Sequence, residues 1–376
     1  MIVLKSSQFK KFLTLVKPKQ RMFSTSETEE VLFETKNNCG VITLNKPKAL
    51  NAINLGMVQL IGEQLEEWEN TKSMVIIRGI GRAFCAGGDI KGATSGGPKN
   101  TIGGKMFFKT EYKMNHKIGT YKVPYIALLD GITMGGGVGL SVHGKYRIAT
   151  ENTLFAMPET AIGLFPDVGA SHFLSRIPGN IGMFLALTGY RLKGAETLKI
   201  GFATHYCKSA DIPELFVRLV ATEGEVKAIE ETLSKFSADT SSIPFSLQDH
   251  LDIIDNAFGL RQVEDIFNAL NKSGSPWAKE IVNTMSKMSP TSLKISQQEL
   301  IMGKSMDLRQ CLQMEYRLAS AALEGTISLD FYEGVRALLI DKDKSPKWKP
   351  EKIEEITESM ILQCFAPVST EDELDL

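Results

Sequence analysis

Apolar and polar residues follow one another along the chain in segments whose spacing predicts strands and helices in regular succession. Residues 74–80 and 123–132 are short, almost continuous apolar runs, which is typical of buried strands. Residues 31–45 predict two strands joined by a turn at residues 36–40, and apolar residues recur at helical spacing over residues 54–70. The order strand, strand, helix, strand then repeats, which indicates an α/β fold built from a recurring unit.

Three later stretches depart from this alternation. Residues 92–123 are first rich in Gly, Ser and Lys and then aromatic and amphipathic, which predicts a mobile loop leading into a helix that carries Glu111. Residues 211–288 are rich in Glu, Lys, Asp and Ser around amphipathic stretches, which predicts a helical insertion. Residues 289–376 predict a C-terminal helical region.

Residues 1–26 predict a targeting segment rather than part of the folded core. They hold Lys, Arg and Ser among apolar residues, and no acid occurs before Glu27. This composition is typical of a mitochondrial transit peptide, with a disordered basic tail as the alternative. We therefore expect a mitochondrial (matrix) protein whose folded part begins near Glu29. No apolar run reaches the roughly 18 residues that a membrane span needs.

Composition narrows the classes of function. The 376 residues are 43% hydrophobic, enough for a large core, and a formal net charge of −1 gives no overall field that would concentrate nucleic acid or an anionic membrane. The five cysteines are scattered and form no CxxC pair, which argues against a disulfide framework or a zinc site and indicates a reducing compartment. Cys85 has no histidine near it in sequence, so a small packing thiol is favoured over a reactive one.

Two glycine-dense turns are the most specific feature of the chain. They are FCAGGD at residues 84–89 and GITMGGGVG at residues 131–139, and each follows a buried-strand run and leads into a predicted helix start. Unpaired backbone N–H groups at two such turns can converge on one point and form an oxyanion hole. The alternative is that the glycines only allow close packing of helix against sheet.

The chemistry near these turns is carboxylate chemistry. The chain contains no Ser-His-Asp order, nucleophile elbow or cluster of metal ligands, whereas Glu159 and Asp167 follow the second turn closely. A hole with carboxylates beside it suits a carbonyl whose oxygen gains charge, as in a thioester, while an acid handles water or a proton. Each acid also follows a proline, so helix capping is an alternative role for both.

Five ordered blocks of sequence resemble the crotonase (enoyl-CoA hydratase/isomerase) superfamily. They are ITLNKPKALNAI, RAFCAGGDIK, ITMGGGVGLS, FAMPETAIGLFPDVG and FLALTGYRLKGAETLKIGFAT, and the resemblance runs from about residue 31 to residue 350. It implies a crotonase (ClpP-like) spiral of β-β-α units over residues 29–210. The helical insertion at residues 211–288 and the C-terminal helices would be additions to that core.

The resemblance also implies roles for particular residues. The N–H groups of Gly88 and Gly136 would face the thioester oxygen as the oxyanion hole. Glu159 and Asp167 would be catalytic, and together with Gly136 and Glu111 they would bind substrate. Helical spacing alone favours a solvated side chain at Glu111, and only the resemblance places this acid at the substrate.

One departure from the family pattern points to the reaction class. Hydratases of the superfamily usually carry a second catalytic glutamate just after the GGG run, where this chain has Gly139. Adding water across a double bond needs two proton-handling groups, whereas hydrolysis releases a thiol with a pKa of about 8.5 that departs readily as thiolate. The sequence therefore predicts a thioester hydrolase, in which Glu159 acts either as nucleophile or as general base.

The resemblance implies a short 3-hydroxyacyl-CoA as substrate, above all 3-hydroxyisobutyryl-CoA from valine breakdown, and coenzyme A is part of this substrate rather than a cofactor. We expect no other cofactor, no metal, and no nucleic-acid or membrane partner. The superfamily often forms trimers, but the insertion can cover the trimer surface, so a monomer or dimer is expected. The alternatives are a hydratase or isomerase of the same fold and a structural subunit of the mitochondrial ribosome.

Overall fold

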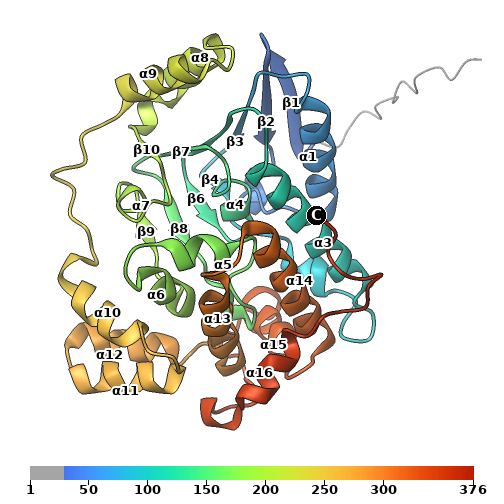
Figure 1. Cartoon of the computed structure of the whole chain (residues 1–376), viewed down its shortest axis with the longest axis vertical. Helices are drawn as coiled ribbons and strands as arrows, with labels where there is room; N and C mark the ends of the chain where they lie inside the picture. Colours follow the sequence, from blue (N-terminus) through green and yellow to red (C-terminus); the bar gives the residue numbers. More distant parts are fainter. Residues whose placement is uncertain (1–28) are drawn as a thin grey trace, which may run out of the picture.

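The computed structural model describes residues 29–376, which fold into two β-sheets surrounded by helices (Figure 1). The predicted transit peptide at residues 1–26 lies outside the described residues. The larger sheet has six strands, in the spatial order β1 (Val31–Lys36), β2 (Cys39–Leu44), β3 (Met74–Gly79), β5 (Tyr125–Leu129), β7 (Tyr146–Ala149) and β10 (His205–Tyr206). The smaller sheet has four, in the order β4 (Ala83–Cys85), β6 (Ile132–Met134), β8 (Leu154–Ala156) and β9 (Leu192–Lys193).

The chain passes repeatedly from the larger sheet to the smaller sheet and then into a helix. The successive units are β3, β4 and α2 (Ile90–Thr94), then β5, β6 and α4 (Gly136–Gly139), then β7, β8 and the 3-10 helix η2 (Glu159–Ile162). The predicted spiral of β-β-α units is thus confirmed. Because β4, β6 and β8 are parallel neighbours, the turns that follow them lie side by side at one edge of the smaller sheet.

The local predictions for the first hundred residues hold with small corrections. The hairpin β1–β2 is antiparallel and turns at Asn37 and Asn38. Helix α1 (Leu55–Trp68) begins after Asn54, whose side chain accepts the N–H of Met57 as an N-cap. The apolar run at residues 123–132 was predicted as one strand and is two, because the chain leaves the larger sheet after Leu129 and enters the smaller one at β6.

Both faces of the larger sheet are buried. One face packs on the main core under α1, and α3 (Ile102–Gly119) packs between α1 and α14. The other face, which includes Val41, Ile76 and Ile126, is covered by α8 (Ile212–Ala221) and α9 (Val226–Phe236). This explains why the strands read as continuous apolar runs rather than as alternating ones.

The remaining helices of residues 211–288 form a separate group at the lower left of Figure 1. They are α10 (Leu251–Phe258), α11 (Val263–Ser273) and α12 (Pro276–Met285). Helices α10 and α12 pack against α6 (Ile181–Thr188), and α11 packs on α10 and α12. The short helices of residues 29–376 not yet named are η1 (Pro47–Ala49), α5 (Ala170–Phe173), η3 (Leu174–Arg176), α7 (Glu196–Lys199), η4 (Ser209–Asp211), η5 (Gln248–His250) and η7 (Ile353–Glu355).

The C-terminal helices cover the edge of the smaller sheet where the glycine turns lie. They are α13 (Pro290–Gly303), α14 (Leu308–Glu324), α15 (Asp330–Val335), the π-helix η6 (Arg336–Ile340) and α16 (Glu358–Cys364). Helix α13 packs on α5 and α6, and α15 packs on η2. Within residues 29–376, no helix has the length and apolar character that crossing a bilayer requires.

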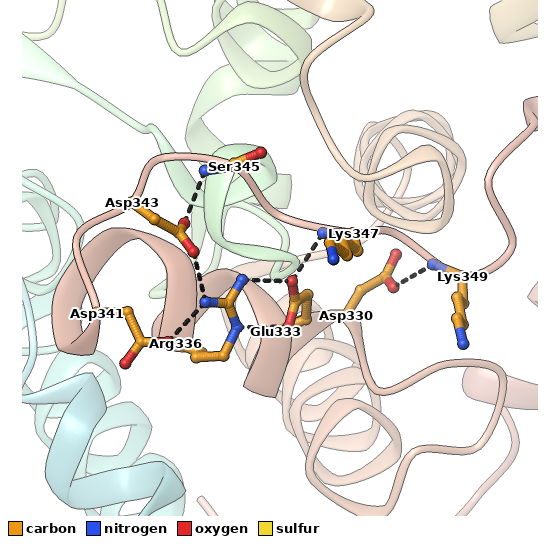
Figure 2. A network of polar contacts seen from close by, with 8 residues as sticks. All are labelled: Asp330, Glu333, Arg336, Asp341, Asp343, Ser345, Lys347 and Lys349. Atoms are coloured by element: carbon orange, nitrogen blue, oxygen red, sulfur yellow. Dashed lines mark hydrogen bonds and ion pairs between the residues drawn. The ribbon is translucent and has the colours of Figure 1, made fainter.

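A polar network fastens the segment after η6 to α15 (Figure 2). The Arg336 guanidinium donates to Glu333, Asp341 and Asp343 at 2.7–2.9 Å. Asp330 accepts the N–H of Lys349 at 2.9 Å through one oxygen and the hydroxyl of Ser289 at 2.6 Å through the other. These contacts fasten the segment after η6, and Ser289 before α13, to α15, the helix that packs on η2.

Candidate active site

The two glycine turns meet at the edge of the smaller sheet, as predicted. Gly88 follows β4, and Gly136 is the first residue of α4. Neither N–H group has a hydrogen-bond acceptor among residues 29–376. Next to Gly88, the Gly87 carbonyl and the Asp89 N–H make the bonds to Ile53. A Cβ atom added to Gly136 would lie 3.2 Å from the Gly88 nitrogen, so the two free N–H groups flank one small space.

Glu159 borders this space from the third turn. It is the first residue of η2 and is only 6% exposed, and its Oε2 has no hydrogen-bond partner in the described part of the chain. A Cβ atom on Gly135 would lie 2.9 Å from Glu159 Oε1, so only a glycine leaves this carboxyl group its place beside the loop. Gly135 also has a φ of +47°, in the left-handed region that favours glycine.

Glu111 borders the same space from helix α3. It is 2% exposed, so the alternative of a solvated glutamate is wrong, and its Oε1 has no partner among the residues described. A Cβ atom on Gly136 would lie 2.6 Å from this oxygen. Glu111 Oε1 therefore lies close to Gly136, at the start of α4, without accepting its N–H.

Asp167 completes the acidic group, but the capping role considered for it is wrong. Helix α5 begins at Ala170 after Gly169 and has no side-chain cap. The Asp167 carboxylate instead accepts a hydrogen bond from the hydroxyl of Tyr112 at 2.8 Å. Tyr112 is adjacent to Glu111 on α3 and was not identified from the sequence, because the two partners are 55 positions apart.

Burial dominates the electrostatics of the three acids. It raises the pKa of Glu159 well above its usual value, and the negative charge of Asp167 raises it further. Burial, followed by the charges of Asp167 and Glu159, also raises the pKa of Glu111. The pKa of Asp167 rises only to about 6, because the hydrogen bond from Tyr112 opposes the effect of burial. Three like charges at one place are unfavourable, so each ionised acid favours the protonated form of its neighbours.

The structure leaves no room for a side chain at Gly139. A Cβ atom there would lie 2.7 Å from Val168 Cβ and 2.8 Å from the amide nitrogen of Asn115. Asn115 is fully buried, and neither its nitrogen nor its oxygen has a partner in residues 29–376. The position where hydratases were expected to carry a glutamate is thus filled by Asn115 and Val168.

Two further buried acids, Glu299 on α13 and Glu315 on α14, were not identified from the sequence. Glu315 accepts three hydrogen bonds, and burial raises its pKa to about 8, although its donors Ser171 and Gly169 favour the ionised form. Glu299 has no hydrogen-bond partner on either oxygen among the described residues, and its pKa is raised by burial and then by Glu315 and Asp167. Each acid lies on the apolar face of its helix. A charged residue at such a position is unusual, and this signal was available in the sequence.

We expect Glu299→Gln to reduce the loss of stability at alkaline pH. An acid with a raised pKa in the folded state stabilises the fold below its unfolded pKa of about 4.3 and ceases to do so as the pH rises through the folded pKa. The free energy of unfolding, measured with urea, should therefore fall less steeply between pH 5 and pH 9 for the variant than for the wild type. At pH 9 the variant should be the more stable of the two. Glu63→Gln, on the exposed face of α1, is the matched control and should leave the slope unchanged. A parallel fall in Glu299→Gln would contradict the assignment of a buried, protonated Glu299.

A cavity of about 300 Å³ adjoins the first glycine turn. It lies between the start of α1, the helix α2 and the first turns of α3, and Phe107 forms part of its wall. The ring of Phe107 would lie 2.9 Å from a Cβ atom on Gly88, so this side chain lies beside the first glycine turn as well as the cavity.

Other chemistry is poorly supported by the described residues. Residues 29–376 contain no group of three or more His, Cys, Asp or Glu side chains arranged to hold a metal ion. Cys85 is fully buried inside the first glycine turn, and burial raises the pKa of its thiol to about 12. The interpretation of Cys85 as a packing thiol is thus confirmed.

Known proteins resemble this chain over nearly its whole length. The family model for enoyl-CoA hydratase/isomerase matches residues 39–365. A Xenopus tropicalis protein named 3-hydroxyisobutyryl-CoA hydrolase, mitochondrial, is 50% identical over 96% of this chain and 95% of its own length. The Homo sapiens protein of that name is 46% identical over 97% of this chain and 95% of its own.

Solved structures agree on the fold. The crystal structure of a carnitinyl-CoA dehydratase from Mycobacterium thermoresistibile is 35% identical, with a TM-score of 0.85, and the match covers 93% of this chain and 99% of that one. That of an enoyl-CoA hydratase from Rhodobacter sphaeroides 2.4.1 is also 35% identical, with a TM-score of 0.84, and covers 92% and 100%. The comparison therefore confirms the predicted fold class.

Proposed function

This chain belongs to the enoyl-CoA hydratase/isomerase family, and from that membership we propose that Glu159 and the free N–H groups of Gly88 and Gly136 form its catalytic centre. The protein is an acyl-CoA thioester hydrolase that converts 3-hydroxyisobutyryl-CoA to 3-hydroxyisobutyrate and coenzyme A, as do the relatives 46–50% identical to it by their names. The single observation that carries this catalytic centre is the convergence of two unpaired N–H groups beside one buried, unpaired carboxyl group.

The proposed centre acts on the thioester carbonyl. The N–H groups of Gly88 and Gly136 donate to its oxygen, and these bonds strengthen as the oxygen gains negative charge in the tetrahedral intermediate. Because the donors are part of the folded backbone, they need no rearrangement when this charge develops. The geometry supports this arrangement, since both donors border the space that a Cβ atom on Gly136 would occupy.

Glu159 has two possible roles, and each gives a balanced reaction. As general base it removes a proton from water, whose oxygen bonds to the carbonyl carbon. The C–S bond then breaks, and coenzyme A leaves as thiolate and is protonated by Glu159. As nucleophile, Glu159 bonds to the carbonyl carbon and expels the thiolate, and water then hydrolyses the mixed anhydride. Single-turnover reaction in ¹⁸O-labelled water tests the second route, because label enters Glu159 only when water attacks the Glu159 carboxyl carbon of the mixed anhydride and releases the 3-hydroxy acid from it.

Asp167 is proposed to bind the 3-hydroxyl group of the substrate or to assist a proton transfer. Its Oδ2 accepts from Tyr112, and this leaves the other oxygen free for a ligand. Glu111 contacts the acyl group in the same proposal, because its Oε1 lies close to Gly136. The centre requires no metal ion or organic cofactor, because its donors and acids belong to the chain itself.

We expect isobutyryl-CoA, which lacks only the hydroxyl group, to be hydrolysed with a kcat/KM lower by about 10³-fold or more. A site built to bind a hydroxyl group leaves its buried polar groups unpaired when the hydroxyl is missing. 3-Hydroxypropionyl-CoA keeps the hydroxyl and lacks one methyl group, so it should lose only about 10- to 200-fold. Thiol release measured with the three esters tests this order. Equal rates for 3-hydroxyisobutyryl-CoA and isobutyryl-CoA would remove hydroxyl recognition from the proposal. If Asp167 binds the hydroxyl group, Asp167→Ala should abolish the discrimination between these two esters.

The protein is mitochondrial, as its relatives are named. We propose the matrix as the compartment and residues 1–26 as the transit peptide, on the basic, acid-free composition of that segment. For assembly we propose a monomer or dimer, because α8 and α9 cover the outer face of the larger sheet and so remove it as a contact surface. Sedimentation velocity of the purified protein tests this proposal.

A further inference from the structure

The loop that carries Asp167 has an unusual backbone. Val168 has a φ of +56° and Gly169 a φ of +85°, so two successive residues lie in the left-handed region. For a β-branched residue such as valine this conformation is unfavourable by about 1–2 kcal/mol. Val168 is also fully buried, so its surroundings must hold it in place.

The main contact that holds this loop comes from Glu315 on α14. Its Oε2 accepts the N–H of Gly169 at 2.6 Å, and its Oε1 accepts the N–H of Ser171 at 3.0 Å and the hydroxyl of Ser171 at 2.5 Å. All three donors bond to the Glu315 carboxyl group, which is itself fully buried.

The other side of the loop is held by His143. Its Nε2 lies 2.7 Å from the carbonyl oxygen of Val168, and since that oxygen can only accept, Nε2 carries the proton. Burial lowers the pKa of His143 to about 4, so the ring is neutral at physiological pH. The Asp167 carbonyl accepts the N–H of Ala170 at 3.0 Å, which closes the turn. The loop is thus fixed on both sides, and the Asp167 carboxylate is fixed with it.

We propose that Glu315 is a positioning residue for Asp167. It lies 146 positions beyond Gly169 and binds the loop rather than the substrate, so it acts through the place and orientation that it gives the Asp167 carboxylate. This inference rests on the proposed function, because it assumes that Asp167 takes part in the reaction. Displacement of a reacting group by about 1 Å can lower a rate by about 100-fold.

The test is a double-mutant cycle between Glu315→Gln and Asp167→Asn, read out by thiol release. Glutamine keeps the shape of Glu315 but turns an NH₂ group toward an N–H donor, which should release the loop. Glu315→Gln alone should lower kcat about 10- to 100-fold with little change in KM. In the Asp167→Asn background it should have no further effect on kcat. Additive effects of the two substitutions, or unchanged kcat in a folded Glu315→Gln variant, would overturn the proposal.

Three controls keep the outcome interpretable. Glu299→Gln changes a second buried acid in the same region that makes no hydrogen bond to the loop, and it should leave kcat unchanged. Ser171→Ala removes only the hydroxyl donor to Glu315 and should have a smaller effect of the same kind, which keeps the test available if Glu315→Gln does not fold. Hydrogen exchange of the Gly169 and Ser171 amides should accelerate in Glu315→Gln, and unchanged exchange would overturn the proposal.

A failure of the proposed function has a different signature. If Asp167→Asn alone retained full activity, the role of Asp167 would fail while the amide exchange still reported whether Glu315 holds the loop. If Asp167→Asn is impaired but Glu315→Gln is not coupled to it, only the positioning role fails.

Discussion

Glu159→Gln is expected to lower kcat for thioester hydrolysis by about 10³-fold or more while the protein remains folded. Glutamine has the shape of glutamate but can neither remove a proton from water nor attack a carbonyl carbon. The side chain is 6% exposed and its Oε2 has no partner within residues 29–376, so the substitution breaks no hydrogen bond seen there. Thiol release under saturating 3-hydroxyisobutyryl-CoA measures the loss.

The raised pKa of Glu159 sharpens this prediction. Because burial and Asp167 favour its protonated form, part of the free enzyme is inactive at acidic pH and the rate should rise with pH until Glu159 is ionised. The rising limb should be absent from the residual activity of Glu159→Gln, which would come from the N–H groups and from binding alone.

A suitable control for Glu159→Gln is Glu196→Gln. The Glu196 side chain is also little exposed, at 9%, and its oxygens accept the N–H groups of Lys193 and Ser246. The control tests whether loss of a buried negative charge in general reduces activity, and it should not. Near-normal hydrolysis by folded Glu159→Gln would show that Glu159 is neither nucleophile nor base. Asp167 and Glu111, the other two acids of the site, would then be the candidates for the catalytic acid.

The sequence predicted the parts of the site that depend on neighbours along the chain. The apolar runs at residues 74–80 and 123–132, the glycine turns after them and the acid after Pro158 are local features. The short strands β4 and β6, which were not predicted, pair in parallel and bring the turns together. The place of Gly88 and Gly136 therefore follows from the sequence once the recurring unit is recognised.

The contacts that fix Asp167 could not be predicted in this way. Tyr112 and Glu315 lie 55 or more positions from the residues they bind. The packing of α3 and α14 brings these partners together, and local sequence does not show that packing. Local reasoning instead left helix capping open as an alternative role for Asp167, because a proline followed by an acid resembles a helix start. The left-handed backbone of Val168 has no sequence signal, since valine rarely adopts it.

The division of residues 123–132 between two sheets was missed for a related reason. The run is apolar throughout, since both of its strands are buried, so hydrophobicity does not mark the change of sheet. The signal that was available is Asp130-Gly131 in the middle of the run, and Gly131 has a φ of +134°. A glycine inside a strand pattern is typical of a bulge or bend.

Gly136→Ala is expected to lower kcat by about 10²- to 10³-fold, the loss typical of removing one donor from an oxyanion hole. The added methyl group would lie 3.2 Å from the Gly88 nitrogen, in the space proposed for the thioester oxygen. Its other close neighbours are Glu111 Oε1 at 2.6 Å and Ile53 Cδ1 at 3.1 Å, and both are the ends of side chains that can rotate away. The variant should therefore fold and bind acyl-CoA but stabilise the charged intermediate poorly.

Two neighbouring substitutions separate this role from packing. Gly137→Ala would place its methyl group 2.1 Å from the carbonyl oxygen of Cys85, a backbone atom that cannot move aside, so it should lower the melting temperature markedly. Gly62→Ala in α1 meets no atom within 4 Å and should leave kcat unchanged while stabilising the helix by up to about 1 kcal/mol. If Gly136→Ala behaved like Gly137→Ala, losing stability and activity together, the glycines would serve packing. Loss of kcat at an unchanged melting temperature is the result that supports the N–H of Gly136 as a donor to the thioester oxygen.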